Sequence, residues 1–408
     1  MANTTLLGLD IGTTKICASI LAYDAQDQAH LLGTGISDSK GIKKGFVSNL
    51  DKLIDSISKA AQAAEDKAGV KARRVVANIS GPSLVGRLQD GLIFLSRRGR
   101  EITKRDVKKV IDTTKHISYT MEKDLLYAVP QEFTIDEAQN VEDPVGLFGT
   151  KLKVRLYVIT ALTTHIQNIA KAVNYAGYDL VDIVPTTVAA ASGLLRKEEK
   201  TDGAVIIDIG GGVTELAVFK EETFRFFDSI NVGGMDLTSC LSSHYNIPFA
   251  SAEMIKRHYG GISKDDLKKD ENNILDIGDR QIVIKSGELN SLLKERFDEI
   301  FHILKERLKG SGYYDNLIPS IIITGGSALL HGALESFEDR LKIRVRMGSI
   351  TGVKGDPSIL NNPLYSAAIS IAKYGLDKEK ARKGHSLKDR FFIVNTFHKF
   401  RDFLEDYF

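Results

Sequence analysis

The sequence has almost no excess charge of either sign, few cysteines and no long apolar run. Its formal net charge is +2, whereas a nucleic-acid-binding domain usually has a pI above about 9 and clustered Lys and Arg, so composition predicts no nucleic-acid partner. The two cysteines, Cys17 and Cys240, lie far apart without metal-site or disulfide spacing, which fits a reducing cytoplasm. No stretch reaches the roughly 18 apolar residues of a transmembrane helix, and no basic leader marks a signal peptide. Any membrane contact is therefore expected to be peripheral.

The sequence does contain one strand, turn and strand plan twice. With 408 residues, 43% of them hydrophobic, the chain can form two or three domains with their own cores. Residues 204–219 place Asp208 at the end of an apolar strand, just before three glycines, and residues 5–24 repeat this plan at Asp10. One such turn could be an ordinary hairpin, but the second copy indicates two related halves whose turns face each other across a cleft.

Both turns suit a phosphate and a hydrated cation. Backbone N–H groups at a glycine turn converge on a concavity that accepts an anion, and glycine has no Cβ to hold a phosphate away. A carboxylate beside the turn can hold Mg²⁺, which keeps several waters and takes one or two carboxylates. The predicted metal ligands, acting through water, are Asp10 and Asp208. The predicted phosphate-binding residues are Gly12, Thr13, Thr14, Lys15, Gly210, Gly211, Gly212 and Thr214.

A third glycine turn follows the two that are predicted to bind phosphate. Residues 320–330 indicate a buried strand, a tight turn at Gly325, Gly326 and Ser327, and the start of a helix. A backbone surface without side chains suits planar rings and ribose. Each turn alone is weak evidence, but the three in this order predict a nucleotide site.

These segments resemble the actin, hexokinase and DnaK-type chaperone superfamily, whose nucleotide site has two phosphate turns and one adenosine turn. Within it the sequence is similar to FtsA, the family of actin-like bacterial cell division proteins, over nearly the whole chain. The segments that carry the similarity are 7–15, 208–215, 231–236, 252–257 and 323–327. The resemblance implies an α/β, two-lobed actin-like fold of duplicated ribonuclease-H-like halves that binds ATP and Mg²⁺.

The resemblance also implies roles for residues outside the three turns. These are further phosphate contacts by Gly233 and Gly234, ribose contacts by Glu253 and Lys256, and a contact between Arg257 and adenine. Because Glu253 and Lys256 are three apart on one helix face, a solvated ion pair is the alternative interpretation.

An inserted segment interrupts the first half. This sequence predicts a helix at 49–68 and a strand at 74–79. In the superfamily, the next elements are another helix and another strand. Here these two elements appear only at 163–175 and 180–184. The intervening residues show their own periodicity and predict a small α+β module, which by resemblance contacts a neighbouring subunit or other division proteins. Its elements are expected at 92–95, 103–116, 125–129, 131–135 and 152–160.

The helix expected at 103–116 is rich in Lys and Arg. A nucleic-acid contact is one interpretation of these charges. Because no aromatic side chains interleave with them and the chain is nearly neutral, a solvated face is favoured.

The expected domain boundaries follow from these elements. A charged linker should separate the core from a C-terminal amphipathic helix. The boundaries are 1–83 and 163–202 for the first core lobe, 84–162 for the inserted module, 203–231 and 318–375 for the second core lobe, 232–317 for a helical lobe that binds nucleotide and peptide, 376–387 for the linker and 388–408 for the terminal helix.

One departure from the chaperone relatives concerns hydrolysis. There a Glu before the Pro of the linking helix helps to activate water and bind the metal, and here that position is Val184. A valine cannot orient a water or accept a proton. We expect at most a weak ATPase, in which ATP acts mainly as a structural switch.

By resemblance, the helical lobe receives the acidic and apolar C-terminal tail of FtsZ, the tubulin-like ring protein. Basic side chains in this lobe could bind its carboxylates, and Arg does so with bidentate geometry. The candidates are Arg280, Lys285, Lys294 and Arg296.

The last residues form a ring-rich pattern at helical spacing. Such a helix can pack on its own domain, on a partner, or in a lipid interface with its apolar side buried about 5 to 10 Å deep. A complete two-half fold leaves no obvious core for it, and FtsA proteins end in a membrane-targeting helix, so anionic membrane lipid is favoured. Against this, four basic and four acidic side chains leave residues 388–408 without net charge. The predicted lipid-facing residues are Phe391, Phe392, Ile393, Phe397, Phe400, Leu404, Tyr407 and Phe408.

Together these features predict an ATP-binding, actin-like filament protein at the division site. It would tie the FtsZ ring to the cytoplasmic face of the membrane and recruit later division proteins. A sugar or metabolite kinase of the same superfamily is one alternative, which would need a catalytic Asp in the cleft and a substrate pocket. A pilus-assembly actin-like scaffold is another, and it would bind a different peptide.

Overall fold

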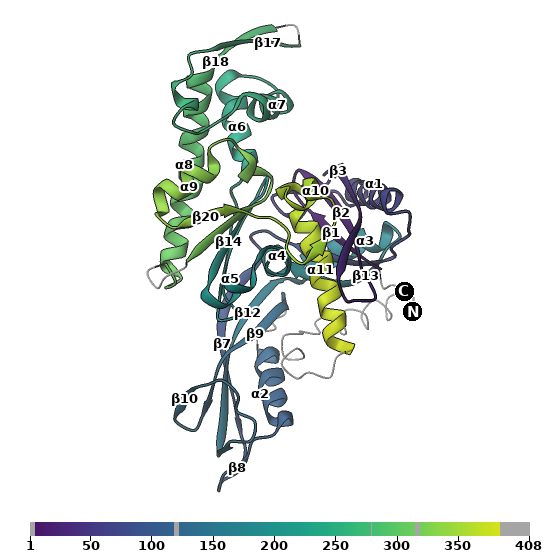
Figure 1. Cartoon of the computed structure of the whole chain (residues 1–408), viewed down its shortest axis with the longest axis vertical. Coiled ribbons are helices and arrows are strands. Elements are labelled where there is room, and N and C mark those ends of the chain that lie inside the picture. The colour runs from purple at the N-terminus through teal and green to yellow at the C-terminus, as the bar shows by residue number, and fades with distance from the viewer. Residues whose placement is uncertain (1–4, 118–121, 279, 315–318, 384–408) are drawn as a thin grey trace.

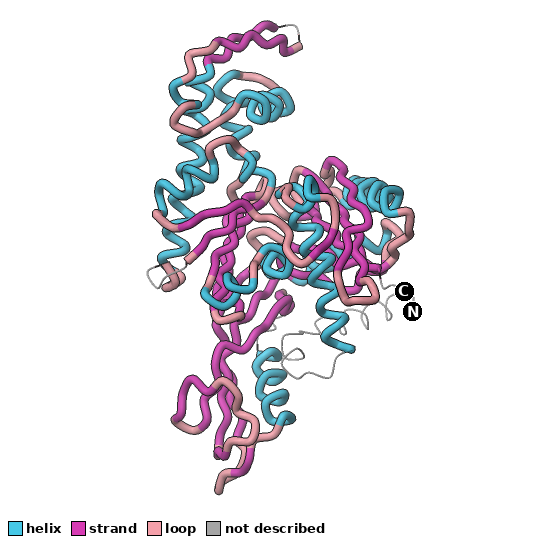
Figure 2. Tube along the Cα trace, in the orientation of Figure 1, coloured by secondary structure: helices cyan, strands magenta, loops and turns pink. Residues whose placement is uncertain are grey.

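The computed structural model describes residues 5–117, 122–278, 280–314 and 319–383. Two lobes lie side by side, and each combines a layer of strands with covering helices (Figures 1 and 2). Residues 85–162 project at one end of the molecule and residues 234–310 at the other (Figure 1). No helix in the described ranges is both long and apolar enough to cross a bilayer.

The first lobe is built on a mixed sheet. The strands β1 (Thr5–Ile11), β2 (Lys15–Tyr23) and β3 (Ala29–Asp38) form an antiparallel meander, and β6 (Arg74–Ile79) and β13 (Asp179–Pro185) continue the sheet in parallel beside β1. The strands β1 and β2 are buried at nearly every position, which is typical of a sheet covered on both faces.

Helices cover both faces of this sheet. On one face, α1 (Leu50–Ala68) packs against β2 and β3 and also contacts α3 (Thr163–Tyr175). The side chain of Asn49 caps the N-terminus of α1 by accepting from the Lys52 N–H, and Gly69 ends it at φ 65°, a conformation that glycine adopts without strain.

The second lobe repeats the topology of the first. The strands β14 (Ala204–Ile209), β15 (Thr214–Lys220) and β16 (Thr223–Ile230) form the meander, and β19 (Ser320–Thr324) and β20 (Arg344–Met347) follow in parallel beside β14. The strand orders β3-β2-β1-β6-β13 and β16-β15-β14-β19-β20 therefore correspond one to one. The prediction of a duplicated, two-lobed α/β fold is confirmed.

The inserted module has its own sheet, helix and core. The long antiparallel strands β7 (Val85–Phe94), β9 (Lys123–Ile135) and β12 (Lys151–Leu162), with β10 (Ala138–Val141) at the edge, are covered by α2 (Lys104–Ile117). The short strands β8 (Arg100–Glu101) and β11 (Phe148–Gly149) pair with each other.

Two strands expected at 125–129 and 131–135 are one strand. The pairing of β9 with β12 shifts register between Arg155 and Leu156, so that Glu132 and Pro130 face consecutive residues of β12. Proline, which has no N–H to donate, is accommodated at such a bulge. The break predicted at Pro130 is therefore wrong.

The helical projection of the second lobe contains α6 (Gly234–Tyr245), α7 (Phe249–Tyr259) and α8 (Ser286–Gly310). A hairpin of β17 (Asn272–Ile277) and β18 (Arg280–Lys285) extends from it (Figure 1). The smaller elements are β4 (Ile42–Lys43), β5 (Phe46–Val47), α5 (Lys197–Asp202), η1 (Asp266–Lys268), η2 (Gly326–Leu329), α9 (Ala333–Leu341), β21 (Val353–Lys354) and α10 (Pro357–Leu360).

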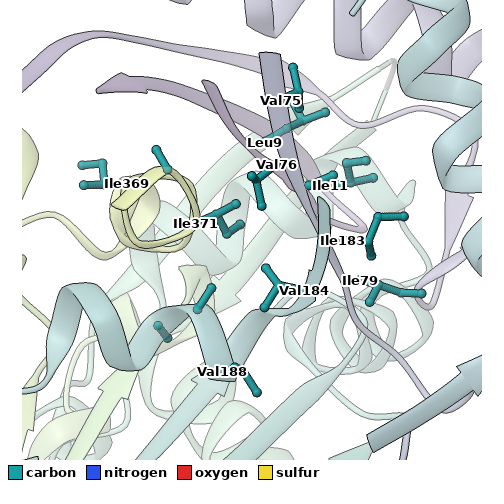
Figure 3. Packing of buried hydrophobic residues seen from close by; sticks show 14 of the residues in the cluster. Leu9, Ile11, Val75, Val76, Ile79, Ile183, Val184, Val188, Ile369 and Ile371 are labelled. Carbon is teal, nitrogen blue, oxygen red and sulfur yellow. The ribbon is translucent and has the colours of Figure 1, made fainter. Parts of the chain in front are cut away.

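The last described helix, α11 (Pro363–Lys383), returns to the first lobe. It packs against β1, β2 and α4 (Thr186–Leu194), and Figure 3 shows Ile371 of α11 pointing toward Val76 and Val184, while Ile369 lies on another side of the helix. The assignment of residues up to 375 to the second lobe is thus wrong for α11, and also for β21, which pairs with β3. Helical periodicity identifies an apolar face but not the sheet that the face will cover.

The linker expected from residue 376 is also wrong in its first part. Residues 376–383 continue α11 without a break, and Leu376 is buried. Lys378 pairs with Asp182 at 2.6 Å, and Glu379 pairs with Arg74. The charges that suggested a solvated linker instead meet opposite charges on the first lobe. The terminal helix predicted at 388–408 lies outside the described residues.

Candidate functional site

A cavity of about 400 Å³ lies between the lobes and is lined by all three predicted turns. Of the predicted nucleotide-site residues, only Thr214 and Gly233 do not line it. The hydroxyl of Thr214 donates to the Val232 carbonyl, and Gly233 packs behind the turn, where an added Cβ would lie 2.6 Å from the Gly210 carbonyl oxygen. The predicted residues that line the cavity are Asp10, Gly12, Thr13, Thr14, Lys15, Asp208, Gly210, Gly211, Gly212, Gly234, Glu253, Lys256, Arg257, Gly325, Gly326 and Ser327.

The two turns predicted to bind phosphate have matching backbones and touch each other. The Gly12 N–H donates to the Lys15 carbonyl, as the Gly210 N–H donates to the Val213 carbonyl. A Cβ added to Gly211 would lie 2.5 Å from Thr14 Cγ2. Only glycine allows the turns to approach so closely, because any larger residue would fill the space between them.

The two predicted metal ligands differ in their surroundings. Asp10 accepts from Lys15 Nζ at 2.8 Å and from Asn78 Nδ2 at 2.9 Å. Asp208 has no such partner in the described residues, and burial together with the negative charge of Asp10 raises its pKa to about 7. Burial is the largest single influence on Lys15 and lowers its pKa, but the charge and hydrogen bond of Asp10 together with the nearby Asp208 and Cys17 outweigh burial, so the pKa is raised and the ammonium group stays charged.

Asn78 and Glu215 are polar cavity residues that the sequence did not predict. Asn78 donates to Asp10 and to Thr186 and accepts from the Ile11 N–H at 2.6 Å, so it ties β6, β1 and α4 together. Glu215 is 2% exposed, and its Oε2 atom has no partner in the described residues. Burial and the neighbouring Asp208 charge raise the pKa of Glu215 well above its ordinary value.

A network on α6 and α7 lines the end of the cavity that is predicted to hold the nucleoside. Lys256 Nζ donates to the Gly234 carbonyl at 2.9 Å and to Glu253 Oε2 at 2.6 Å. Arg257 Nε donates to Glu253 Oε1 at 2.9 Å, and 67% of the Arg257 side chain is exposed. The ion pair between Glu253 and Lys256, which the sequence offered as an alternative to ribose binding, is present. Glu253, Lys256 and Arg257 also line the cavity.

The third turn packs directly on the second. Ser327 Oγ donates to the Gly210 carbonyl at 3.0 Å. Gly325 has φ 88°, and a Cβ there would lie 2.3 Å from Asp208 Oδ1. The turn continues into a short 3₁₀ segment, η2, rather than directly into the α-helix that the sequence suggested. Leu329, Leu330 and His331, which sequence reasoning did not single out, line the cavity beyond it.

The donor set fits a magnesium nucleotide. No group of three or more His, Cys, Asp or Glu within the described ranges could hold a metal alone. Mg²⁺ needs only one or two carboxylates when phosphate oxygens and water complete its octahedron. Asp208 and Asp10 can supply those carboxylates, and the glycine turns leave room for phosphates without Cβ atoms.

Among the four predicted peptide-binding residues, Lys294 and Arg296 do not share one face. Lys294 pairs with Asp298 at 3.0 Å, and Arg296 pairs with Glu299 at 2.8 Å. Because Lys294 and Arg296 are two apart on α8, their side chains point in different directions. Lys285 is exposed at the end of β18, and Arg280 opens that strand, although its side chain is not among those described. The predicted lipid-facing residues, Phe391 to Phe408, lie outside the described ranges.

Comparison with known proteins gives the family. A family model for the cell division protein FtsA matches residues 205–370, and one for the SHS2 domain inserted in FtsA matches residues 87–160. The chain is 31% identical over 376 residues to cell division protein FtsA of Pseudomonas aeruginosa, covering 92% of this chain and 90% of that protein. It is 29% identical over 386 residues to that of Borreliella burgdorferi, covering 94% of each.

Solved structures give the fold. The PilM–PilN type IV pilus biogenesis complex matches with a TM-score of 0.66 and 16% identity, covering 91% of this chain and 98% of that chain. MreB5 of Spiroplasma citri bound to ADP matches with a TM-score of 0.54 and 17% identity, covering 94% and 99%. The duplicated sheets around one cleft therefore define a two-lobed, actin-like protein. The chain belongs to the FtsA family of cell division proteins.

Proposed function

We propose that this FtsA-family protein binds ATP with Mg²⁺ in the cleft, forms filaments, and anchors FtsZ to the cytoplasmic face of the membrane at the division site, where it recruits later division proteins. The observation that carries the nucleotide part is the convergence of three glycine turns and two carboxylates on one cavity. That MreB5 of Spiroplasma citri, which shares this fold, has been solved with ADP supports the choice of ligand.

The cleft can act as a switch because each lobe supplies part of it. Thr13, Thr14 and Lys15 come from the first lobe, and Gly211 and Gly212 come from the second. A ligand held by both lobes has higher affinity for their closed arrangement than for an open one, and it shifts the population by that difference. The relative orientation of the lobes would in turn set the surface available for polymerisation.

The residues of the cleft favour slow hydrolysis. Val184 is 1% exposed and lies within the apolar core seen in Figure 3, so it offers no group to a water molecule. Glu215 does face the cavity, but its raised pKa favours the protonated form, which is a poor general base. We expect turnover far below the median enzyme value of about 10 per second.

Membrane attachment is assigned to the C-terminal residues by their sequence. Ion pairs of Lys378 and Glu379 fix α11 to the first lobe, and 25 residues follow Lys383, where this helix ends. The apolar and aromatic side chains among them suit an interfacial helix. The FtsZ contact is assigned to the helical lobe, where Lys285 is exposed and forms no ion pair with the described residues.

The decisive experiment is co-sedimentation with vesicles of phosphatidylglycerol and phosphatidylcholine in ATP and Mg²⁺. The full chain is compared with a chain ending at Lys383, where α11 ends. A labelled peptide of the FtsZ tail reports recruitment. We expect the full chain to pellet with vesicles and carry the peptide, and the shorter chain to bind the peptide in solution but largely fail to bring it to the vesicles. Equal pelleting of both chains, or no peptide binding by either, would contradict the proposal.

A further inference from the structure

We propose that the exposed face of α2 is a second contact for anionic lipid, which orients the inserted module against the membrane. This inference rests on the proposed membrane function and goes beyond it, because it assigns a lipid-binding surface to the folded part of the chain. The basic face is defined as Lys104, Arg105, Lys108 and Lys109.

The basic face is exposed and its charges are not neutralised locally. All four side chains are exposed, and none takes part in an ion pair with the described residues. The two acidic residues of α2 are already engaged: buried Asp106 binds Arg100, and Asp112 lies 3.7 Å from Lys115.

Packing fixes the direction in which the basic face points. The opposite side of α2 is apolar and packs on β7 and β12 through buried Val107, Val110 and Ile111. The four basic residues occupy positions i, i+1, i+4 and i+5 of the helix and therefore lie together. They point away from the sheet as one cationic surface.

The basic face lies on the side of the molecule where the described chain ends. Figure 1 shows α2 on the same side of the inserted sheet as the C-terminal end of α11. The two helices are close enough for their charges to interact: the pKa of Lys115 is lowered mainly by burial and also by the charges of Lys108 and Lys378. A membrane that holds the last 25 residues would thus be within reach of α2.

Charge complementarity identifies the partner as an anionic surface. The predicted lipid-facing segment, 388–408, has four basic and four acidic residues and supplies no net attraction. Basic residues next to an anionic bilayer strengthen binding, by about fivefold for each Lys or Arg. The basic face can therefore supply the electrostatic part of binding, while the terminal segment supplies the apolar part.

The test uses the full chain with Lys104, Arg105, Lys108 and Lys109 all changed to Gln, which removes charge while keeping a good helix former. The matched control changes four exposed basic residues elsewhere, Lys52, Lys268, Lys342 and Arg344, to Gln. Partition onto vesicles of phosphatidylglycerol and phosphatidylcholine is measured at several salt concentrations and compared with phosphatidylcholine alone. Circular dichroism on heating verifies that each variant is folded.

We expect the α2 variant to bind the anionic vesicles at least about tenfold more weakly than the control variant and to lose most of its salt dependence. Exchanging each Lys for Arg and Arg105 for Lys should retain binding. If the α2 and control variants bind equally while the full chain still binds, this inference is overturned and the membrane proposal stands.

Two other outcomes would also overturn the inference. If the full chain binds no vesicles, the membrane proposal itself fails, and the role of α2 fails with it. If the basic face mediates tighter binding to short duplex DNA than to anionic vesicles at equal salt, α2 is a site for a different polyanion.

Discussion

The two turns predicted to bind phosphate share a backbone conformation but not an electrostatic environment. Asp10 and Asp208 occupy the same position before the first glycine of each turn, and Lys15 corresponds to Val213. Lys15 neutralises Asp10 at 2.8 Å, whereas the second turn has no cation at the equivalent place. Burial and the nearby Asp10 charge raise the pKa of the second carboxyl, Asp208, to about 7.

The difference extends to the next strand. Asp10 faces Cys17 across the first hairpin, and Asp208 faces Glu215 across the second. One register position thus holds a buried thiol in the first lobe and a buried carboxyl in the second. The topology of the duplicated lobes was retained, while their side chains diverged into a cationic turn that can attract phosphate and an acidic turn that can hold a cation.

The largest effect is expected from destroying the contact between the turns. Changing Gly211 to Val places a side chain where a Cβ alone would lie 2.5 Å from Thr14, so it must fill the cavity or separate the lobes. We expect ATP affinity to fall by about tenfold to a hundredfold, corresponding to roughly 1 to 3 kcal/mol of overpacking. Titration with a fluorescent ATP analogue measures this. Changing Gly310 to Ala, where a Cβ meets nothing within 4 Å, is the control.

The pH dependence of ATP binding distinguishes the roles of Asp208 and Asp10. Below about pH 7 Asp208 retains its proton in the free protein, because burial and the Asp10 charge raise its pKa to about 7. Binding of Mg²⁺ to an ionised Asp208 must release that proton, so Mg²⁺-dependent ATP affinity should rise by up to about tenfold per pH unit below 7 and level off above it.

Changing Asp208 to Asn should remove this pH dependence. Changing Asp10 to Asn should move its midpoint to lower pH, because the Asp10 charge helps to hold the Asp208 proton. Calorimetric titration in buffers of different ionisation enthalpy counts the released protons. The same slope in wild type and in the Asp208 variant would mean that another group titrates.

A smaller effect is expected at a contact between the lobes. Lys44, from the first lobe, places Nζ 3.4 Å from both the Asn231 carbonyl and Asp236 Oδ1 of the second. Because the side chain is 39% exposed, such a pair contributes at most about 1 kcal/mol. Changing Lys44 to Ala should weaken ATP binding about twofold to fivefold, and the same change at exposed Lys43 should have no effect. Equal losses at both positions would argue against a specific contact.

The sequence was sufficient for the duplicated lobes, the inserted module and the cavity residues of the three turns, because glycine turns and apolar strands are local signals. The sequence was insufficient where contacts between distant segments determine the direction of a side chain or the end of a helix. Strand alternation should have warned that Thr214 and Glu215 cannot both face the cavity. The sequence-based choice was Thr214, yet Thr214 bonds to Val232 and Glu215 faces the cavity. Likewise, nothing local reveals that Lys378 will meet Asp182 and extend α11.

The smallest effect on ATP binding is expected at Glu215. This change tests whether the second turn carries one ionised carboxylate or two. If its raised pKa keeps this carboxyl protonated, Gln reproduces both its shape and its charge, and the Gly81 N–H keeps an oxygen to donate to. Changing Glu215 to Gln should therefore alter ATP affinity by less than about twofold, whereas Ala leaves the Gly81 N–H unpaired at a cost of about 1 to 3 kcal/mol in the free energy of unfolding. Fluorescent ATP titration and thermal unfolding measure the two quantities. If Gln weakens Mg²⁺-dependent binding as strongly as Asn does at Asp208, then Glu215 is ionised in the complex, and the second turn holds its cation with two carboxylates rather than one.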